Sequence, residues 1–171
     1  MKAVAFLLAG GLTLSAAPAS AQAPNDAQIA HIVVTANQVD IDAGKLAADW
    51  GTHADVKAFG SMMAKDHMGV NKLAGDLAAK LKVKPEDNPT SQSLKSGGMK
   101  NVSHLKTLKG AAFDKAYIDN EVAYHQAVLD AVDKTLIPSA QNDELKALIV
   151  KVRPAFVAHL EKAKSIQGSL K

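Results

Sequence analysis

The chain has 171 residues, no cysteine and a formal net charge of +3 from 20 basic and 17 acidic residues. The absence of cysteine excludes disulfides, thiol redox chemistry, iron–sulfur clusters and cysteine-based zinc sites. The balanced charge and the 4% of aromatic residues argue against a nucleic-acid partner, because such binding needs a basic face with stacking side chains.

Residues 1–21 are predicted to be a signal peptide. Lys2 provides a positive start, Ala3 to Leu14 is an apolar run, and a small-residue A-x-A sequence allows cleavage after Ala21. The apolar run is too short to span a bilayer, which takes about 20 residues, and no later run is a better candidate. We therefore expect an exported protein, periplasmic in a bacterium and not transmembrane after cleavage, with residues 22–171 forming a single domain.

The first two predicted helices each carry one polar residue on an apolar face. Between Asp26 and Asp49, apolar residues recur every three or four positions, the period of one helical face, and Asp40 lies on that face. After a break at Gly51-Thr52, a second helix is predicted from His53 to Lys82, with His67 on its apolar face.

A long connection and a short helix are expected next. Residues 85–98 hold two prolines and a Gly-Gly pair, a composition typical of a loop. A short helix is then predicted from Met99 to Leu108, before Gly110.

The last two helices repeat the pattern of the first two. One is predicted from Ala111 to Leu136, where Pro138 ends it, and the other from Asn142 or Asp143 to Ser169. Again a single histidine lies on each apolar face, His125 on the third long helix and His159 on the fourth.

These elements predict an all-α fold, a ferritin-like four-helix bundle with a short extra helix in the long crossover between helices two and three. Short connections make helices one and two an antiparallel pair, and likewise helices three and four. A single long crossover between two such hairpins is the ferritin-like arrangement.

Asp40, His67, His125 and His159 form a candidate metal site. Each falls near the middle of its helix, and the midpoints of bundle helices lie at one level whichever way the helices run. Burying such groups without partners costs a few kcal/mol apiece, which a bound metal would remove. Imidazole with a carboxylate suits zinc, copper or iron. The alternative is a metal-free network of buried hydrogen bonds.

Two more acidic residues are candidates near this site. Glu121 precedes His125 by one helical turn on the same face, so it is an additional ligand, a partner that orients a ligand, or a boundary residue paired with a lysine. Asp66 points about 100° away from His67 and could orient a histidine of a neighbouring helix.

The sequence leaves two main hypotheses about function, with a metal-dependent redox enzyme as a third. In the first, the protein binds one transition-metal ion for metal handling or defence against envelope stress. In the second, it is a metal-free structural or interaction domain of the cell envelope with a partner there. The chain has no nucleophile elbow, phosphate-binding loop or dinucleotide motif, so an enzymatic activity would depend on a bound metal, and we expect a non-enzymatic role.

Four motifs, in order along the chain, resemble those of a bacterial family, the domain-of-unknown-function family numbered 4142. They are DIDAGKLA at 40–47, MAKDH at 63–67, FDKAY at 113–117 with His125-Gln126 after it, and PAFVAHL at 154–160. The resemblance implies a ferritin-like, mostly helical, exported domain, of the kind described as outer-membrane or periplasmic, without an established biochemical role.

Two positions depart from the family pattern. Asp40 stands where the family usually has glutamate, which gives a shorter reach, and Arg153 stands where it usually has an apolar residue. The chain also lacks a Glu-x-x-His sequence, the signature of di-iron proteins of the ferritin-like type. A mononuclear site is therefore expected rather than ferroxidase or iron-storage activity.

Overall fold

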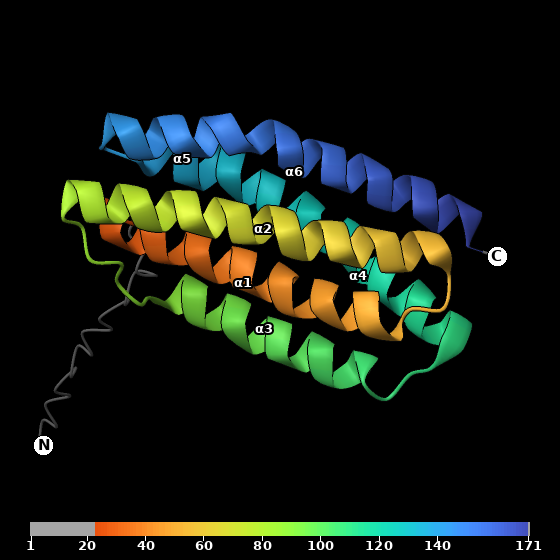
Figure 1. Ribbon diagram of the computed structural model, residues 1–171. Helices are drawn as coiled ribbons and strands as arrows, with labels where there is room; N and C mark the ends of the chain where they lie inside the picture. The colour runs from red at the N-terminus through yellow and green to blue at the C-terminus, as the bar shows by residue number, and fades with distance from the viewer. Residues whose placement is uncertain (1–22, 171) are drawn as a thin grey trace, which may run out of the picture.

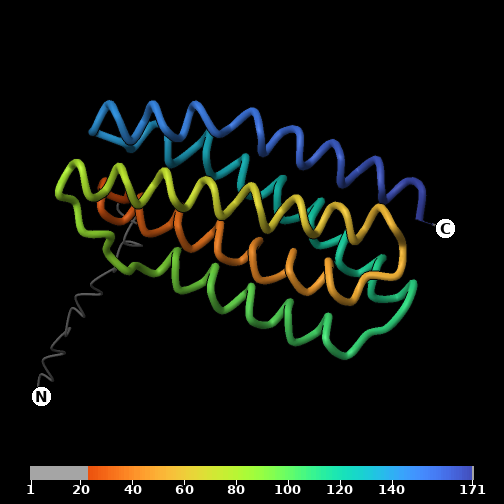
Figure 2. The backbone as a smooth tube through the Cα atoms, viewed as in Figure 1, coloured from red at the N-terminus to blue at the C-terminus, as the bar shows by residue number. Residues whose placement is uncertain are grey.

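The computed structural model describes residues 23–170, which form a bundle of helices (Figures 1 and 2). Its long helices are α1 (Asp26–Trp50), α2 (Ala54–Leu81), α4 (Gly110–Ala131) and α6 (Asp143–Ser169), with α3 (Pro89–Leu105) along the outside of α1. The described residues contain no strand, so the prediction of an all-α bundle is confirmed. The predicted signal peptide lies outside the described residues. No helix within 23–170 has both the length and the apolar character needed to cross a membrane.

The hairpin of α1 and α2 is packed backbone to backbone. A Cβ atom on Gly44 would lie 2.7 Å from the carbonyl oxygen of Gly60, and one on Gly60 would lie 2.6 Å from that of Gly44. Only glycine allows helices to approach this closely. The contact holds the two helices in one register, and thereby sets Asp40 of α1 beside His67 of α2.

The four long helices close a ring, in which α1 packs on α2, α2 on α6, α6 on α4 and α4 on α1. The apolar core inside this ring is interrupted at mid-length. One end is filled by a cluster that includes Phe59, Phe113 and Tyr117, and the other by a cluster that includes Ile29 and Leu145. The buried polar side chains lie between these ends, which keep water away from them.

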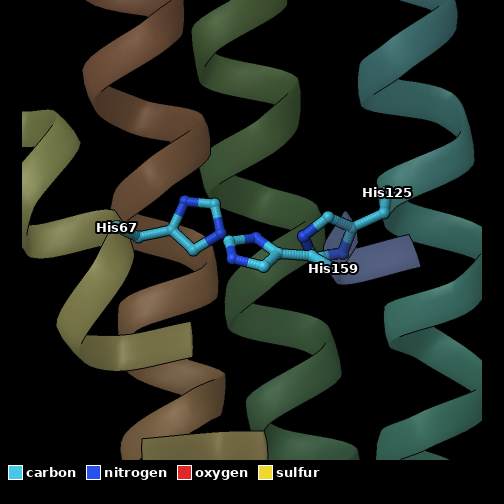
Figure 3. Close-up of side chains that lie close together, drawn as sticks. All are labelled: His67, His125 and His159. Carbon is cyan, nitrogen blue, oxygen red and sulfur yellow. The ribbon is translucent and has the colours of Figure 1, made fainter. Parts of the chain in front are cut away.

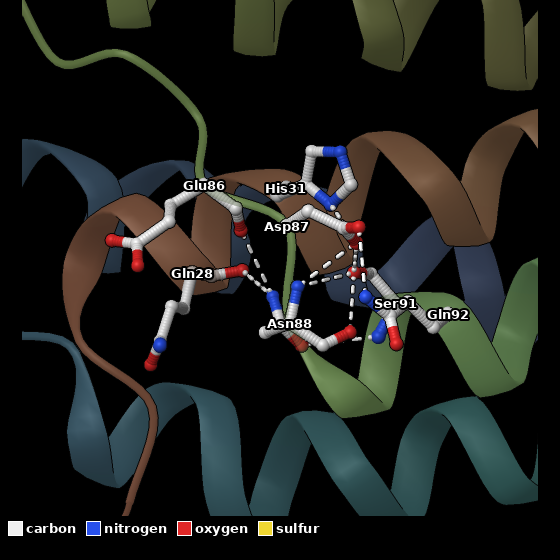
Figure 4. A network of polar contacts seen from close by, with 7 residues as sticks. All are labelled: Gln28, His31, Glu86, Asp87, Asn88, Ser91 and Gln92. Atoms are coloured by element: carbon white, nitrogen blue, oxygen red, sulfur yellow. Dashed lines mark hydrogen bonds and ion pairs between the residues drawn. The ribbon is translucent and has the colours of Figure 1, made fainter.

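The structure corrects the prediction of a loop over residues 85–98 and of only a short extra helix. Helix α3 begins at Pro89, ten residues before the predicted start (Figure 4). Asn88 Oδ1 accepts a hydrogen bond from the Ser91 backbone N–H at 3.0 Å, and Ser91 Oγ accepts one from the Asn88 N–H at 3.1 Å. Proline is favoured at the first position of a helix, because the N–H that it lacks would have no helical acceptor there. Pro89 therefore marks a helix start.

The Gly-Gly pair lies inside α3, where its two members differ. A Cβ atom on Gly98 would lie 2.6 Å from Cγ2 of Val39, whereas one on Gly97 would meet nothing within 4 Å. Gly98 thus lets α3 lie close against α1.

We expect the substitutions Gly97→Ala and Gly98→Ala to have opposite effects on stability. Gly97→Ala should stabilise the fold by about 0.5–1 kcal/mol, because alanine loses less backbone freedom on folding. Gly98→Ala should destabilise it by about 1–3 kcal/mol through overpacking against Val39. Urea unfolding of the two variants measures this, and a shift of both in one direction would contradict the packing described.

The third long helix also departs from the prediction, which extended it to Leu136. The α-helix ends at Ala131, and Val132–Leu136 forms a π-helical turn in which the Ile137 N–H donates to the Val132 carbonyl, five residues earlier. A short helix α5 (Ile137–Ser139) follows and contains Pro138. The apolar spacing from which the helix was predicted does not distinguish a π-helical turn from an α-helical one.

Candidate metal centre

Three histidines from three helices point at one another inside the bundle (Figure 3). They are His67 of α2, His125 of α4 and His159 of α6, and at most 4% of each is exposed. Each offers one ring nitrogen such that the three atoms lie within 4.8 Å of one another. They meet because each helix turns its apolar face inward and carries a histidine at mid-length on that face.

A chain of side-chain amides fixes the protonation of His67. Asn71 Nδ2 donates to the Val34 carbonyl at 3.4 Å, and Asn37 Nδ2 donates to Asn71 Oδ1 at 3.0 Å. The side-chain oxygen of Asn37, Oδ1, lies 2.7 Å from His67 Nδ1 and can only accept a hydrogen bond. His67 therefore carries its proton on Nδ1, which leaves a lone pair on Nε2.

The other two histidines are oriented in the same way by different acceptors. His125 Nδ1 lies 3.1 Å from the backbone carbonyl oxygen of Glu121, to which it donates. His159 Nε2 lies 3.1 Å from Oδ2 of Asp66, to which it donates. The lone pairs are thereby left on His125 Nε2 and on His159 Nδ1.

These three free nitrogens are the atoms that a metal ion would need. His67 Nε2, His125 Nε2 and His159 Nδ1 are buried and have no hydrogen-bond partner among residues 23–170. Metal-bound histidines usually donate their other N–H to a carboxylate, an amide or a backbone carbonyl, as all three do here. Nitrogen ligands lie about 2.1 Å from a bound zinc ion, so small side-chain movements would bring converging histidines of this kind onto one ion.

Two buried carboxyl groups adjoin the histidines. Asp40 of α1, Glu121 and His125 form a second set of ligand atoms that lie within 4.8 Å of one another. Asp40 Oδ2 lies 3.3 Å from the free Nε2 of His67. Because this nitrogen carries no proton, the contact needs either a proton on Asp40 or a cation between the two atoms. Neither carboxyl oxygen of Glu121 has a partner within hydrogen-bonding geometry in the described part of the chain, although Oε2 lies 3.5 Å from Nδ1 of His125 and the carboxyl group interacts with that of Asp40.

Burial favours the uncharged form of all five side chains. It lowers the pKa of His67 to about 3 and that of His125 to about 4, with repulsion between the histidines adding to the effect, and also lowers the pKa of His159. It raises the pKa of Asp40 well above 3.8. Burial first, and then the nearby charge of Asp40, raises the pKa of Glu121 well above 4.5. Neutral imidazole is the form that binds metals.

Two tyrosines lie beside the carboxyl groups. The Tyr124 hydroxyl donates to the Ala36 carbonyl at 3.1 Å, whereas the Tyr117 hydroxyl is buried with no partner within residues 23–170. Burial raises the pKa of Tyr117, and the charge of Glu121, one turn away, raises it further. Tyr117 therefore remains a neutral hydroxyl on this side of the centre.

The structure brings together every residue that the sequence singled out. Asp40, Glu121 and the three histidines share the buried centre, and Asp66 contacts a histidine of the neighbouring helix, as expected of it. Sequence reasoning missed Asn37, which is 2% exposed and sets the tautomer of His67. Its signal was present, because Asn37 lies three residues before Asp40 and therefore on the same helical face.

The donor set defines the chemistry that the centre can support. Three neutral imidazoles and two carboxylates match a divalent ion of intermediate softness, and the two negative charges would balance the charge of that ion inside a dry core. Sulfur ligands from cysteine are excluded, because the chain has none.

Comparisons with known proteins point to one family. No curated protein and no solved structure matches the chain. The family model described as "Domain of unknown function (DUF4142)" matches residues 12–166, a range that contains the whole buried centre, and it confirms the resemblance carried by the four motifs. Since the match covers most of the 171 residues, the chain belongs to the DUF4142 family.

Proposed function

We propose that this protein is an exported, ferritin-like bundle that binds one transition-metal ion, zinc, copper or iron, at its centre. His67, His125, His159 and Asp40 are the ligands, and Glu121 is an additional ligand or a charge partner. The role that follows is metal handling or defence against stress in the bacterial envelope.

The observation that carries this proposal is the set of unpartnered buried atoms. A metal-free structural domain requires its core polar groups to satisfy one another, since each buried group left without a partner costs about 1–3 kcal/mol. Three imidazole nitrogens and two carboxyl oxygens of the centre find no partner among the described residues. One cation among the three histidines would satisfy their nitrogens together, and the second set, which shares His125, places Asp40 and Glu121 beside it.

Chain topology and the start of the sequence support the other parts of the proposal. Two antiparallel hairpins, α1 with α2 and α4 with α6, are joined by one long connection that carries α3, as in ferritin-like bundles. The positive, apolar and small-residue segments of 1–21 support export. Protein recovered from the periplasm should begin at Gln22, which mass spectrometry measures directly.

Elemental analysis of untagged protein purified from its native compartment is the decisive experiment. We expect about one transition-metal ion per chain, and a melting temperature that falls when a chelator removes it, because ligand binding stabilises the native state. A protein without metal, with a melting curve indifferent to zinc, copper and iron, would overturn the proposal and favour the metal-free interaction domain.

Asp66 should tune metal affinity without binding the metal. Its side chain is 43% exposed and accepts the Nε2 proton of His159, whose own side chain is 6% exposed. We expect Asp66→Ala to weaken Zn²⁺ binding about 10–100-fold, the usual effect of losing such a partner, and Asp66→Asn to weaken it less, since the amide oxygen still accepts. Isothermal titration calorimetry measures both. Asp76→Ala, an exposed position on the same helix, is the control, and equal affinities in all three variants would exclude this role.

A further inference from the structure

An apolar cavity of about 40 Å³, partly open to the surface, is lined mainly by residues of α1, α2 and α6. It belongs to the half of the bundle where α1 and α6 begin and α2 ends, as the course of the helices in Figure 1 shows. Its walls include Val33, Ala74, Leu77, Leu145, Ile149 and Phe156. Native cores are packed with few voids larger than a water molecule, so a cavity of this size is a feature of the fold that calls for a role.

The cavity reaches the candidate metal centre through a single side chain. Phe156 lines the cavity and stacks on the ring of His67, with ring centroids 5.5 Å apart and planes inclined by 9°. The same ring lies 6.4 Å from that of His159. Val70, another wall residue, is one helical turn beyond His67. A molecule in the cavity would therefore lie in the layer directly behind two of the three histidines.

The walls offer water almost no hydrogen-bonding partner and therefore favour an apolar occupant. The volume exceeds the ~10–15 Å³ that one water needs, but a buried water also needs two or more polar partners. Asp26 and Asn142 are the polar members of the lining, and both are engaged elsewhere. The carboxylate of Asp26 accepts from the N–H groups of Gln141 and Asn142, and Asn142 Oδ1 caps α6. Apolar cavities in proteins take up small apolar molecules such as xenon.

We propose that this cavity is a binding site for a small apolar molecule of the size of dioxygen, held next to the metal centre. Occupation of the cavity needs no metal, so it can be tested by itself. Only the suggestion that the bound molecule lies beside a metal ion with which it could react rests on the proposed function. The site would concentrate such a molecule behind Phe156, one side chain away from the ligands of the ion.

Xenon is the probe for this site, measured by ¹²⁹Xe NMR titration of the full protein and by a crystal pressurised with xenon. We expect one saturable site, with xenon between α1, α2 and α6. Ala74→Leu should abolish it by filling the cavity, and Val33→Ile should weaken it with a smaller change in volume. Ala79→Leu is the matched control, because Ala79 is an exposed alanine of the same helix that does not line the cavity.

Two results would overturn the proposal. One is the absence of saturable xenon binding to the wild-type protein, and the other is equal binding by Ala74→Leu and Ala79→Leu when circular dichroism shows both folded. Metal content measured on the same samples separates this proposal from the proposed function. A protein that binds metal but no xenon would overturn only the proposal of the cavity site. A protein that binds xenon but no metal would overturn only the proposed metal centre.

Discussion

Replacing His125 with alanine is expected to lower the affinity for Zn²⁺ by more than about 100-fold, since even the loss of an orienting partner costs 10–100-fold. His125 belongs to both sets of candidate ligands, so its removal affects the histidine side and the carboxylate side together. His67→Ala and His159→Ala should have similar effects, because each removes one of the three converging nitrogens. Calorimetric titration of chelator-treated protein measures these affinities.

Thermal unfolding provides a second measurement of the same loss. At a metal concentration 100 times its dissociation constant, binding stabilises the wild-type protein by about 2.7 kcal/mol, and the histidine variants should gain almost nothing from the same concentration. His104→Ala is the control, because His104 is an exposed histidine far along α3. Wild-type affinity for Zn²⁺ in all three variants, His67→Ala, His125→Ala and His159→Ala, would show that these histidines are structural.

The double substitution of Asp40→Asn with Glu121→Gln is expected to make the metal-free protein more stable at neutral and alkaline pH while it abolishes metal binding. Burial raises the pKa of both carboxyl groups above their ordinary values of 3.8 and 4.5. In this range the folded state holds protons that the unfolded state has released. Stability therefore falls as the pH rises from about 4 towards the raised pKa values, and the neutral amides remove this dependence.

The histidines should produce the opposite dependence in acid. Burial lowers the pKa of His67 from 6.5 to about 3 and that of His125 from 6.5 to about 4. The unfolded state thus binds protons below pH 6.5 that the folded state refuses, and stability falls as the pH drops through this window. The metal-free wild type should therefore be most stable at mildly acidic pH. The double variant should keep the loss of stability in acid and should no longer lose stability as the pH rises.

Urea unfolding in the presence of chelator, repeated across the pH range, measures both dependences. Asp42→Asn serves as the control, because Asp42 is an exposed carboxylate of the same helix as Asp40. A double variant with the same alkaline decline as Asp42→Asn would refute the account of Asp40 and Glu121 as buried, neutral groups.

Much of the candidate centre could be predicted without coordinates, because helical periodicity is local. A polar residue on an apolar stripe identifies an inward-facing side chain, and one such residue in each long helix, at mid-length, is enough to predict a meeting point. Asp40, His67, His125 and His159 were found in this way. The angle at which Asp66 leaves its helix also suggested that it orients a histidine of a neighbouring helix, and the structure identifies that residue as His159.

Other features depended on contacts between segments far apart in the chain. The Gly-Gly pair of α3 has the composition of a loop, and only the approach of Val39 shows why Gly98 belongs in a helix. The cavity beside Phe156 is a gap among three helices, and no single stretch of sequence encodes it.

The sequence by itself determined the helical class, the inward-facing polar residues and the family, because each of these depends on residue type and spacing along one chain. Only the tertiary structure decided which nitrogen of each histidine is free, since that choice is made by Asn37, by the Glu121 carbonyl and by Asp66. It also decided that the two carboxyl groups meet and that their pKa values are raised, because burial is a property of the assembled bundle.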